Sequence, residues 1–160
     1  MIIFPKQLKL FTDPATVLNT LANKKYYTKS STIEEIYNSM TSNHINTTDF
    51  GLAFFGKPVS KNAFSQFCRL INSYAHYLSK RTDYHLLEED LGHDIELIDK
   101  NAIKSLLFSD TSLCAVNGEN FPRIPNHSLL TGIITHISTL PNIDIENIKV
   151  SLHDEEMIVY

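Results

Sequence analysis

The sequence predicts an α+β fold, with about five helices around a long central helix at residues 60–81 and a small antiparallel sheet that includes a C-terminal hairpin. Two patterns carry this prediction. Apolar residues between 60 and 81 recur at steps of three and four, which is the spacing of one helix face. Apolar and polar residues alternate from 148 to 152, which is the spacing of a strand.

The central helix is expected because its apolar positions form one stripe and no proline or glycine interrupts it. Ser60 can accept hydrogen bonds from the amides of the first turn, and Lys80 and Arg81 complement the helix dipole at the other end. We expect the other elements to pack on the apolar stripe, whose members are Ala63, Phe64, Phe67, Cys68, Ile71, Tyr74, Ala75 and Leu78.

Two shorter helices are expected before the central helix. Asp13 can cap the first, and Pro14 suits its first helical position. Ser31 and Thr32 are each followed three residues later by a glutamate, so either residue can begin the second helix with a capping box. The other segments here are expected to be an edge strand at residues 1–4, a polar link at 26–30 and a short strand at 50–55.

Residues 83–100 fit two structures, a short helix that Gly92 ends or a strand at residues 95–98. Asn101 is expected to cap a helix at residues 102–108.

The C-terminal third is expected to begin with a strand at residues 113–116 and a tight turn at Asn117 and Gly118. Ser128 can cap a helix that runs to Leu140 and is apolar almost all round, so we expect that helix to be buried. A hairpin should close the chain, with strands at 148–152 and 157–160 around a polar turn.

The chain of 160 residues is expected to form a single domain, with an apolar fraction of 42% that suffices for a core. Its two cysteines, Cys68 and Cys114, fall on apolar segments and are expected to be buried thiols. The N-terminal residues lack a signal-peptide pattern, and no apolar run is long enough to span a bilayer. We therefore expect a cytoplasmic protein that does not enter a membrane.

Charge is distributed unevenly along the sequence. Residues 1–81 contain ten Lys or Arg and four Asp or Glu, whereas residues 82–160 contain four and fourteen. The acidic stretch at residues 82–99 should either bind a basic partner or form a solvated face that pairs with the basic half of the same chain. It contains no Lys or Arg and seven acids, namely Asp83, Glu88, Glu89, Asp90, Asp94, Glu96 and Asp99.

No motif indicates catalysis or a cofactor. The triplet Asp49-Phe50-Gly51 matches a kinase metal-binding motif, but every other kinase element is missing. The seven histidines lack metalloprotease spacing, the five glycines form no phosphate-binding loop, and the acidic stretch lacks the ligand order of a calcium loop. The lysines and tyrosines at residues 24–29 are too few to bind the phosphates of a nucleic acid. We expect no catalytic residue, metal, cofactor or nucleic-acid partner.

In general character the chain resembles the immunity proteins of interbacterial toxin systems such as contact-dependent growth inhibition. The likeness rests on its small size, its acidic residues between 84 and 99, and its lack of a recognisable active site. The resemblance implies a non-catalytic bacterial protein that binds and neutralises a basic toxin domain, commonly a nuclease. By that analogy the seven acids, with Asp154, Glu155 and Glu156 as a second group, would occupy the toxin surface that otherwise contacts nucleic-acid phosphates.

Two alternatives stay open. A small enzyme would use His93 or His127 with a nearby carboxylate in a concave pocket. A homodimeric structural module would be built on the central helix and would expose Phe64 and Phe67 in the monomer.

Overall fold

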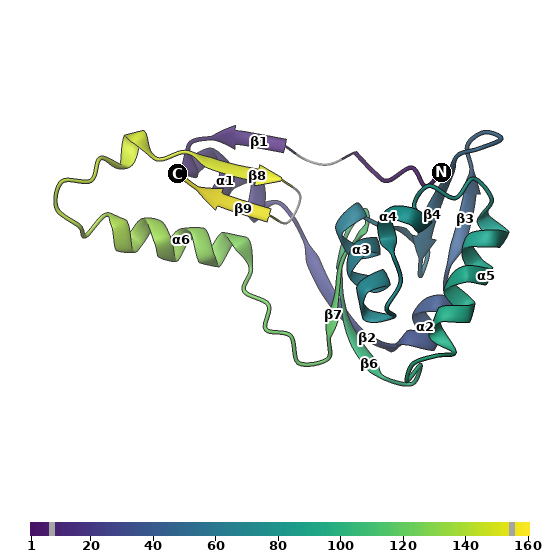
Figure 1. The fold of residues 1–160 in the computed structure, drawn as a ribbon. Coiled ribbons are helices and arrows are strands. Elements are labelled where there is room, and N and C mark those ends of the chain that lie inside the picture. The colour runs from purple at the N-terminus through teal and green to yellow at the C-terminus, as the bar shows by residue number, and fades with distance from the viewer. Residues whose placement is uncertain (7–8, 154–155) are drawn as a thin grey trace. The chain divides into compact units, whose positions relative to one another are not determined.

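The computed structural model describes residues 1–6, 9–153 and 156–160, whose contacts divide into two compact units (Figure 1). The first unit comprises Met1–Pro5 and Tyr26–Phe121, and the second comprises Lys6–Lys25 and Pro122–Tyr160. The predicted α+β class is confirmed. The described residues form three antiparallel sheets of three strands each, where the sequence indicated one small sheet. That the chain behaves as a single domain stays a prediction.

The first unit contains two of the sheets, with strand orders β2-β6-β7 and β3-β4-β5. Four helices belong to the same unit, and α3 packs on β7 while α2 packs on α5 (Figure 1). In chain order, the elements of this unit are β2 (Tyr26–Thr32), α2 (Ile33–Asn38), β3 (Thr41–His44), β4 (Phe50–Phe54), β5 (Lys57–Pro58), α3 (Lys61–Leu70), α4 (Ala75–Leu78), α5 (Tyr84–Ile95), β6 (Ile103–Ser109) and β7 (Leu113–Gly118).

Aromatic side chains fill the centre of the first unit. Phe64 and Phe67 of α3 are fully buried, and the ring of Phe67 lies 5.3 Å from that of Phe54 on β4. Leu87 and Leu91 of α5 join the same core. The predicted buried face of the central segment is therefore correct up to Ile71 and again at Leu78, which are both buried, and wrong at the exposed Tyr74.

The prediction of one long helix at residues 60–81 is wrong, because α3 ends at Leu70 and a separate short helix, α4, follows. The break lies at Asn72, which adopts the left-handed conformation with a φ of 58°. The amide of Ser73 donates to the carbonyl of Cys68 at 2.8 Å, and the amide of Asn72 donates to that of Arg69 at 3.2 Å. These two bonds form the Schellman end of a helix, and asparagine tolerates the left-handed position better than most residues do.

Two segments that were expected to be a polar link and a helix are neighbouring strands. β2 replaces the link at 26–30, and β6 replaces the helix at 102–108. Tyr27 pairs with Phe108 across the two strands, and their rings stack with centroids 5.2 Å apart. Buried Leu106 and Phe108 are two residues apart, as the pleat of a strand requires.

The strand at 113–116 is confirmed but extends further than expected. Asn117 and Gly118 belong to β7 and pair with Ser105 and Lys104 of β6, so the predicted tight turn at these two residues is wrong. The chain turns just beyond them, where the amide of Phe121 donates to the carbonyl of Gly118 at 3.1 Å.

The helix starts follow the local signals. The carboxylate of Asp13 accepts the amide of Thr16 at 2.9 Å at the start of α1. Thr32 and Glu35 form both bonds of a capping box, at 3.1 and 3.0 Å, at the start of α2. Residues 83–100 contain one helix, α5, which passes through Gly92 rather than ending there.

The second unit contains the third sheet, of order β1-β8-β9, and the helices α1 and α6. The C-terminal hairpin is confirmed. The helix expected from Ser128 begins at Asn126 instead, and Leu130 is its only fully buried residue, so the expectation of a buried helix is wrong. The elements of the second unit are β1 (Lys9–Thr12), α1 (Pro14–Ala22), α6 (Asn126–Ile137), the 3-10 turn η1 (Ile145–Asn147), β8 (Val150–His153) and β9 (Glu156–Val159).

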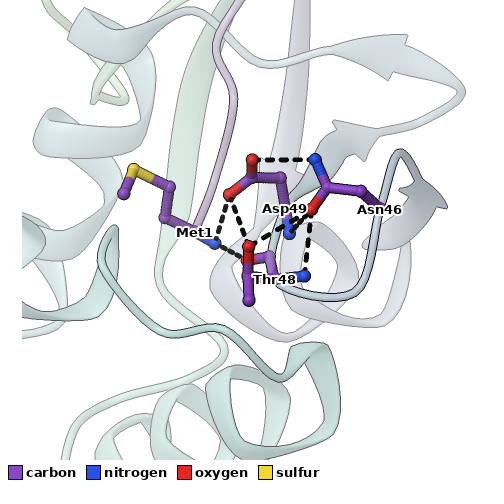
Figure 2. A network of polar contacts seen from close by, with 4 residues as sticks. All are labelled: Met1, Asn46, Thr48 and Asp49. Carbon is purple, nitrogen blue, oxygen red and sulfur yellow. Dashed lines mark hydrogen bonds and ion pairs between the residues drawn. The ribbon is translucent and has the colours of Figure 1, made fainter.

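A loop after β3 gathers polar contacts around the amino group of Met1 (Figure 2). That group donates to the carbonyl of Thr48 and to the carboxylate of Asp49, the latter at 3.1 Å. The carboxamide of Asn46 donates to Asp49 at 3.0 Å and accepts its amide at 2.9 Å. The hydrogen bond from Asn46, and then that from the Met1 ammonium, hold the pKa of Asp49 below its usual value. In the expected edge strand, Ile2 forms one isolated parallel bridge.

Candidate binding groove

The acidic stretch does not form one face, because its acids lie near both ends of α5 and on two different sides of that helix. The residues near its two ends hold the backbone. The carboxylate of Asp83 caps the helix start by accepting the amide of residue 85 at 2.8 Å. Glu96 pairs with Lys100 at 3.0 Å, and Asp99 accepts the amide of residue 101 at 3.1 Å. These three acids of the predicted site therefore have local structural roles.

Glu88 lies on the side of α5 that faces α2. The hydroxyl of Tyr37 donates to the carbonyl of Glu88 at 2.9 Å, and that of Tyr84 donates to the carbonyl of Met40 at 3.2 Å. Burial, followed by a hydrogen bond with Glu88, raises the pKa of Tyr84 well above its usual value. Glu88 therefore belongs to the packing between these two helices.

A second side of α5 lines, together with α4, a groove of about 420 Å³ within the first unit. α4 and its flanking turns contribute the aromatic and cationic wall, while α5 contributes the acidic wall. We call this the α4–α5 groove. It is lined by Tyr74, Tyr77, Leu78, Arg81, Glu89, Asp90, His93 and Asp94.

Among the described residues that line the groove, Arg81 is the one Lys or Arg, and two groups of the same chain hold it. Its Nη2 lies 2.8 Å and its Nε 2.9 Å from Oδ2 of Asp90. Its guanidinium also lies over the ring of Tyr77, 4.9 Å from the centroid. An aromatic face and a carboxylate together are a strong arrangement for a guanidinium.

Asp94 lies at the other end of the groove and accepts a hydrogen bond from the hydroxyl of Ser73. Ser73 directly follows Asn72, and the helix break at Asn72 brings its hydroxyl next to Asp94. Beneath the groove, burial first and then the charge of Asp94 raise the pKa of the Cys68 thiol to about 12. Cys68 is thus an inert core residue, as expected from the sequence, and Cys114 is also buried and free of a disulfide.

The exposed residues of the groove are the two tyrosines, Glu89 and His93. Tyr74 is 82% exposed and Tyr77 is 61% exposed. Glu89 is exposed too, and within the described parts of the chain it forms no hydrogen bond or ion pair. Sequence reasoning named Glu89, Asp90 and Asp94 but missed the tyrosines, because it placed Tyr74 in the buried stripe of an unbroken helix.

The two candidate histidines are in different units. His93 lines the groove, whereas His127 lies near the start of α6 in the second unit. Across residues 1–6, 9–153 and 156–160, His93 forms no hydrogen bond with a carboxylate, and no group of three or more His, Cys, Asp or Glu is placed to hold a metal ion. The second acidic group, Asp154, Glu155 and Glu156, lies outside the residues whose side chains are described.

None of the helices in the described part of the chain is long and apolar enough to cross a bilayer. Comparisons of the chain with protein-family models, curated proteins and solved structures gave no match.

Proposed function

We propose that this chain is a non-catalytic binding protein whose α4–α5 groove docks a basic protein, in the manner of an immunity protein that neutralises a toxin domain. One observation carries the proposal: two exposed tyrosines stand beside carboxylates in a concave surface. Tyrosine supplies a large contact area at low entropic cost and is enriched where binding energy concentrates. An isolated solvated acidic face needs no such aromatic pair.

The distribution of charge supports a basic partner. The first unit contains twelve Asp or Glu and eight Lys or Arg, whereas the second contains six of each. The acidic excess of the chain therefore belongs to the unit that carries the groove. Such an excess attracts a basic partner during the encounter and disfavours acidic ones.

The test begins with capture of partners from the native host at low salt, followed by identification and purification of any basic protein retained. The purified pair should form a stoichiometric complex that raised salt weakens. The chain should also suppress the toxic or enzymatic activity of that protein. A purified basic candidate that neither binds nor loses activity would contradict the proposal, as would capture of acidic proteins only.

The small-enzyme alternative has one observation in its favour, since the groove holds His93 together with carboxylates. A histidine that acts as a base is usually oriented by a hydrogen bond to a third group. No such bond to His93 is found among the described residues. An exposed Phe64 and Phe67 would have supported the homodimer alternative, and both are buried. Binding of a basic protein is therefore the function we propose.

A further inference from the structure

We propose that the open half of the α4–α5 groove binds the side chain of one arginine of the partner. This inference rests on the proposed function and names the group that the groove recognises. The occupied half of the groove provides the precedent, because Arg81 already rests on Tyr77 and pairs with Asp90 there. The remaining half offers the same two kinds of group without a cation.

The open half consists of Tyr74, Glu89, His93 and Asp94. Tyr74 is the residue before α4 and directly follows Ser73, whose hydroxyl donates to Asp94. Tyr74 and Asp94 therefore lie at the same end of the groove, and Asp94 lies one helical turn beyond Asp90 along α5. A tyrosine and a carboxylate are also the two kinds of group that hold Arg81.

Charge makes the open half attractive to a cation. Once Arg81 has paired with Asp90, the lining still contains the carboxylates of Glu89 and Asp94. Asp94 receives one neutral hydrogen bond, from Ser73, and Glu89 receives none from any described residue. Neither carboxylate has a cationic partner within the described residues, so a cation from outside can neutralise both.

The shape of the site favours arginine over lysine. A guanidinium is planar, so it can stack on a tyrosine ring and still direct parallel N–H groups at a carboxylate. An ammonium is strongly hydrated and satisfies only one of these contacts at a time.

The test is an NMR titration of the whole chain with the blocked tripeptide Gly-Arg-Gly, and in parallel with Gly-Lys-Gly. The arginine peptide should cause saturable shifts at Tyr74, Tyr77 and His93, and the lysine peptide should bind about fivefold more weakly. Tyr74→Ala and Glu89→Gln should each weaken the arginine peptide about fivefold. Leu97→Ala and Glu119→Gln alter exposed residues outside the groove and should change nothing.

Shifts that do not saturate, that centre on another surface, or that are equal for the two peptides would overturn the inference. This titration needs no partner protein, so its failure is distinct from failure of the proposed function. A partner that bound the chain with unchanged affinity after Tyr74→Ala would likewise overturn the arginine site while leaving the binding function intact.

Discussion

At the scale of single residues, Gly92 determines how closely α5 approaches α2. A methyl group at residue 92 would lie 2.6 Å from the hydroxyl oxygen of Tyr37 and 3.2 Å from the adjacent ring carbon. That hydroxyl is held in place because it donates to the carbonyl of Glu88. Gly92 is thus a packing residue inside the helix rather than the helix end that the sequence indicated.

Gly92→Ala should lower the free energy of unfolding by about 1–3 kcal/mol, because the tyrosine must move and lose its hydrogen bond. Gly132 is the matched control, since it also lies inside a helix but has open space around it. Gly132→Ala should stabilise α6 by roughly 0.5–1 kcal/mol through helix propensity. Urea unfolding of both variants, and of Gly92→Ala in a Tyr37→Phe background, measures the effect. A Gly92→Ala protein as stable as the parent would refute this packing role.

One buried thiol and two partly buried tyrosine hydroxyls should make the stability of the fold sensitive to high pH. Burial raises the pKa of Cys68 from 9.0 to about 12 and also raises the pKa of Tyr37 and Tyr84. Above pH 9 the unfolded chain therefore loses protons that the folded chain retains, and stability falls as the pH rises. The stabilisation from these groups is complete below their unfolded pKa values.

The urea midpoint should accordingly decrease steadily from about pH 8 to about pH 10.5, before the folded thiol ionises. Cys68→Ala should be less stable at every pH, but its midpoint should decrease less steeply because one of the shifted groups is gone. Reaction of the thiols with a disulfide reagent at pH 8 should occur only after unfolding. A midpoint that is constant or rises over this pH range would contradict the account.

At the scale of elements, the break between α3 and α4 creates the groove. Without it, Tyr74 would continue along the helix that carries the buried Phe67 and Ile71. The left-handed residue Asn72 turns the chain, so Ser73 reaches Asp94 and α4 presents its tyrosines to solvent. The α4–α5 groove therefore depends on one asparagine.

Asn72→Ala should destabilise the protein by roughly 1 kcal/mol. Alanine is strained at positive φ and lacks the short polar side chain that lets asparagine tolerate this conformation. Asn72→Gly should be neutral or slightly stabilising, since glycine adopts this conformation without strain. Thermal unfolding of the two variants gives the comparison. Equal melting temperatures for the two variants would show that this residue does not govern the break.

Sequence patterns predicted the elements that have local signals and missed those determined by tertiary pairing. The caps at Asp13 and Thr32 were correct because their hydrogen bonds are made within one turn of chain. The helix expected at 102–108 is strand β6, which pairs with a distant strand, β2, on one side and with β7 on the other. No local pattern encodes that pairing.

The sequence predicted only part of the candidate site, because the rest of the site depends on tertiary structure. The acids could be named from composition, but their division between the two ends and two sides of α5 could be seen only once the bounds of that helix were known. The tyrosines required recognition of the break at Asn72. An asparagine that follows an apolar helix stripe is a weak C-terminal signal, and here it was outweighed by the apolar residues that continue beyond it.

At the scale of the whole molecule, the two units differ in the size of the cores that their described residues form. The buried cluster of the first unit contains aromatic rings and residues from both of its sheets. Among the described residues, the buried cluster of the second unit comprises Val17, Leu21, Leu130, Val150 and Leu152. Five aliphatic side chains contribute much less stabilisation by burial than the larger cluster of the first unit does.

Hydrogen exchange should therefore protect the amides of α3 and β6 more strongly than those of α1 and β8. The comparison is made on the intact chain by mass spectrometry, with β3 and its exposed residues as a low-protection reference within the first unit. Equal protection in the two units would indicate that they open together, as the single-domain prediction requires.

The uneven distribution of charge along the sequence can also be interpreted only for the whole molecule. The basic and acidic halves of the sequence do not correspond to the two units, since the first unit includes residues from both halves. Arg81 from the basic half neutralises Asp90 from the acidic half, while Glu89 is left without a cationic partner among the described residues. Among the acids that line the groove, Glu89 is accordingly the one whose charge can be reversed without breaking a described contact.

The most direct measurement is the dissociation constant of the complex with the basic partner for Glu89→Lys, compared with Glu119→Lys at low and raised salt. Both substitutions change net charge equally at exposed positions of the first unit, but only Glu89 lines the groove. We predict that Glu89→Lys weakens binding at least about tenfold and reduces the salt dependence, whereas Glu119→Lys has little effect. Equal effects of the two substitutions would show that general acidity, and not the α4–α5 groove, attracts the partner.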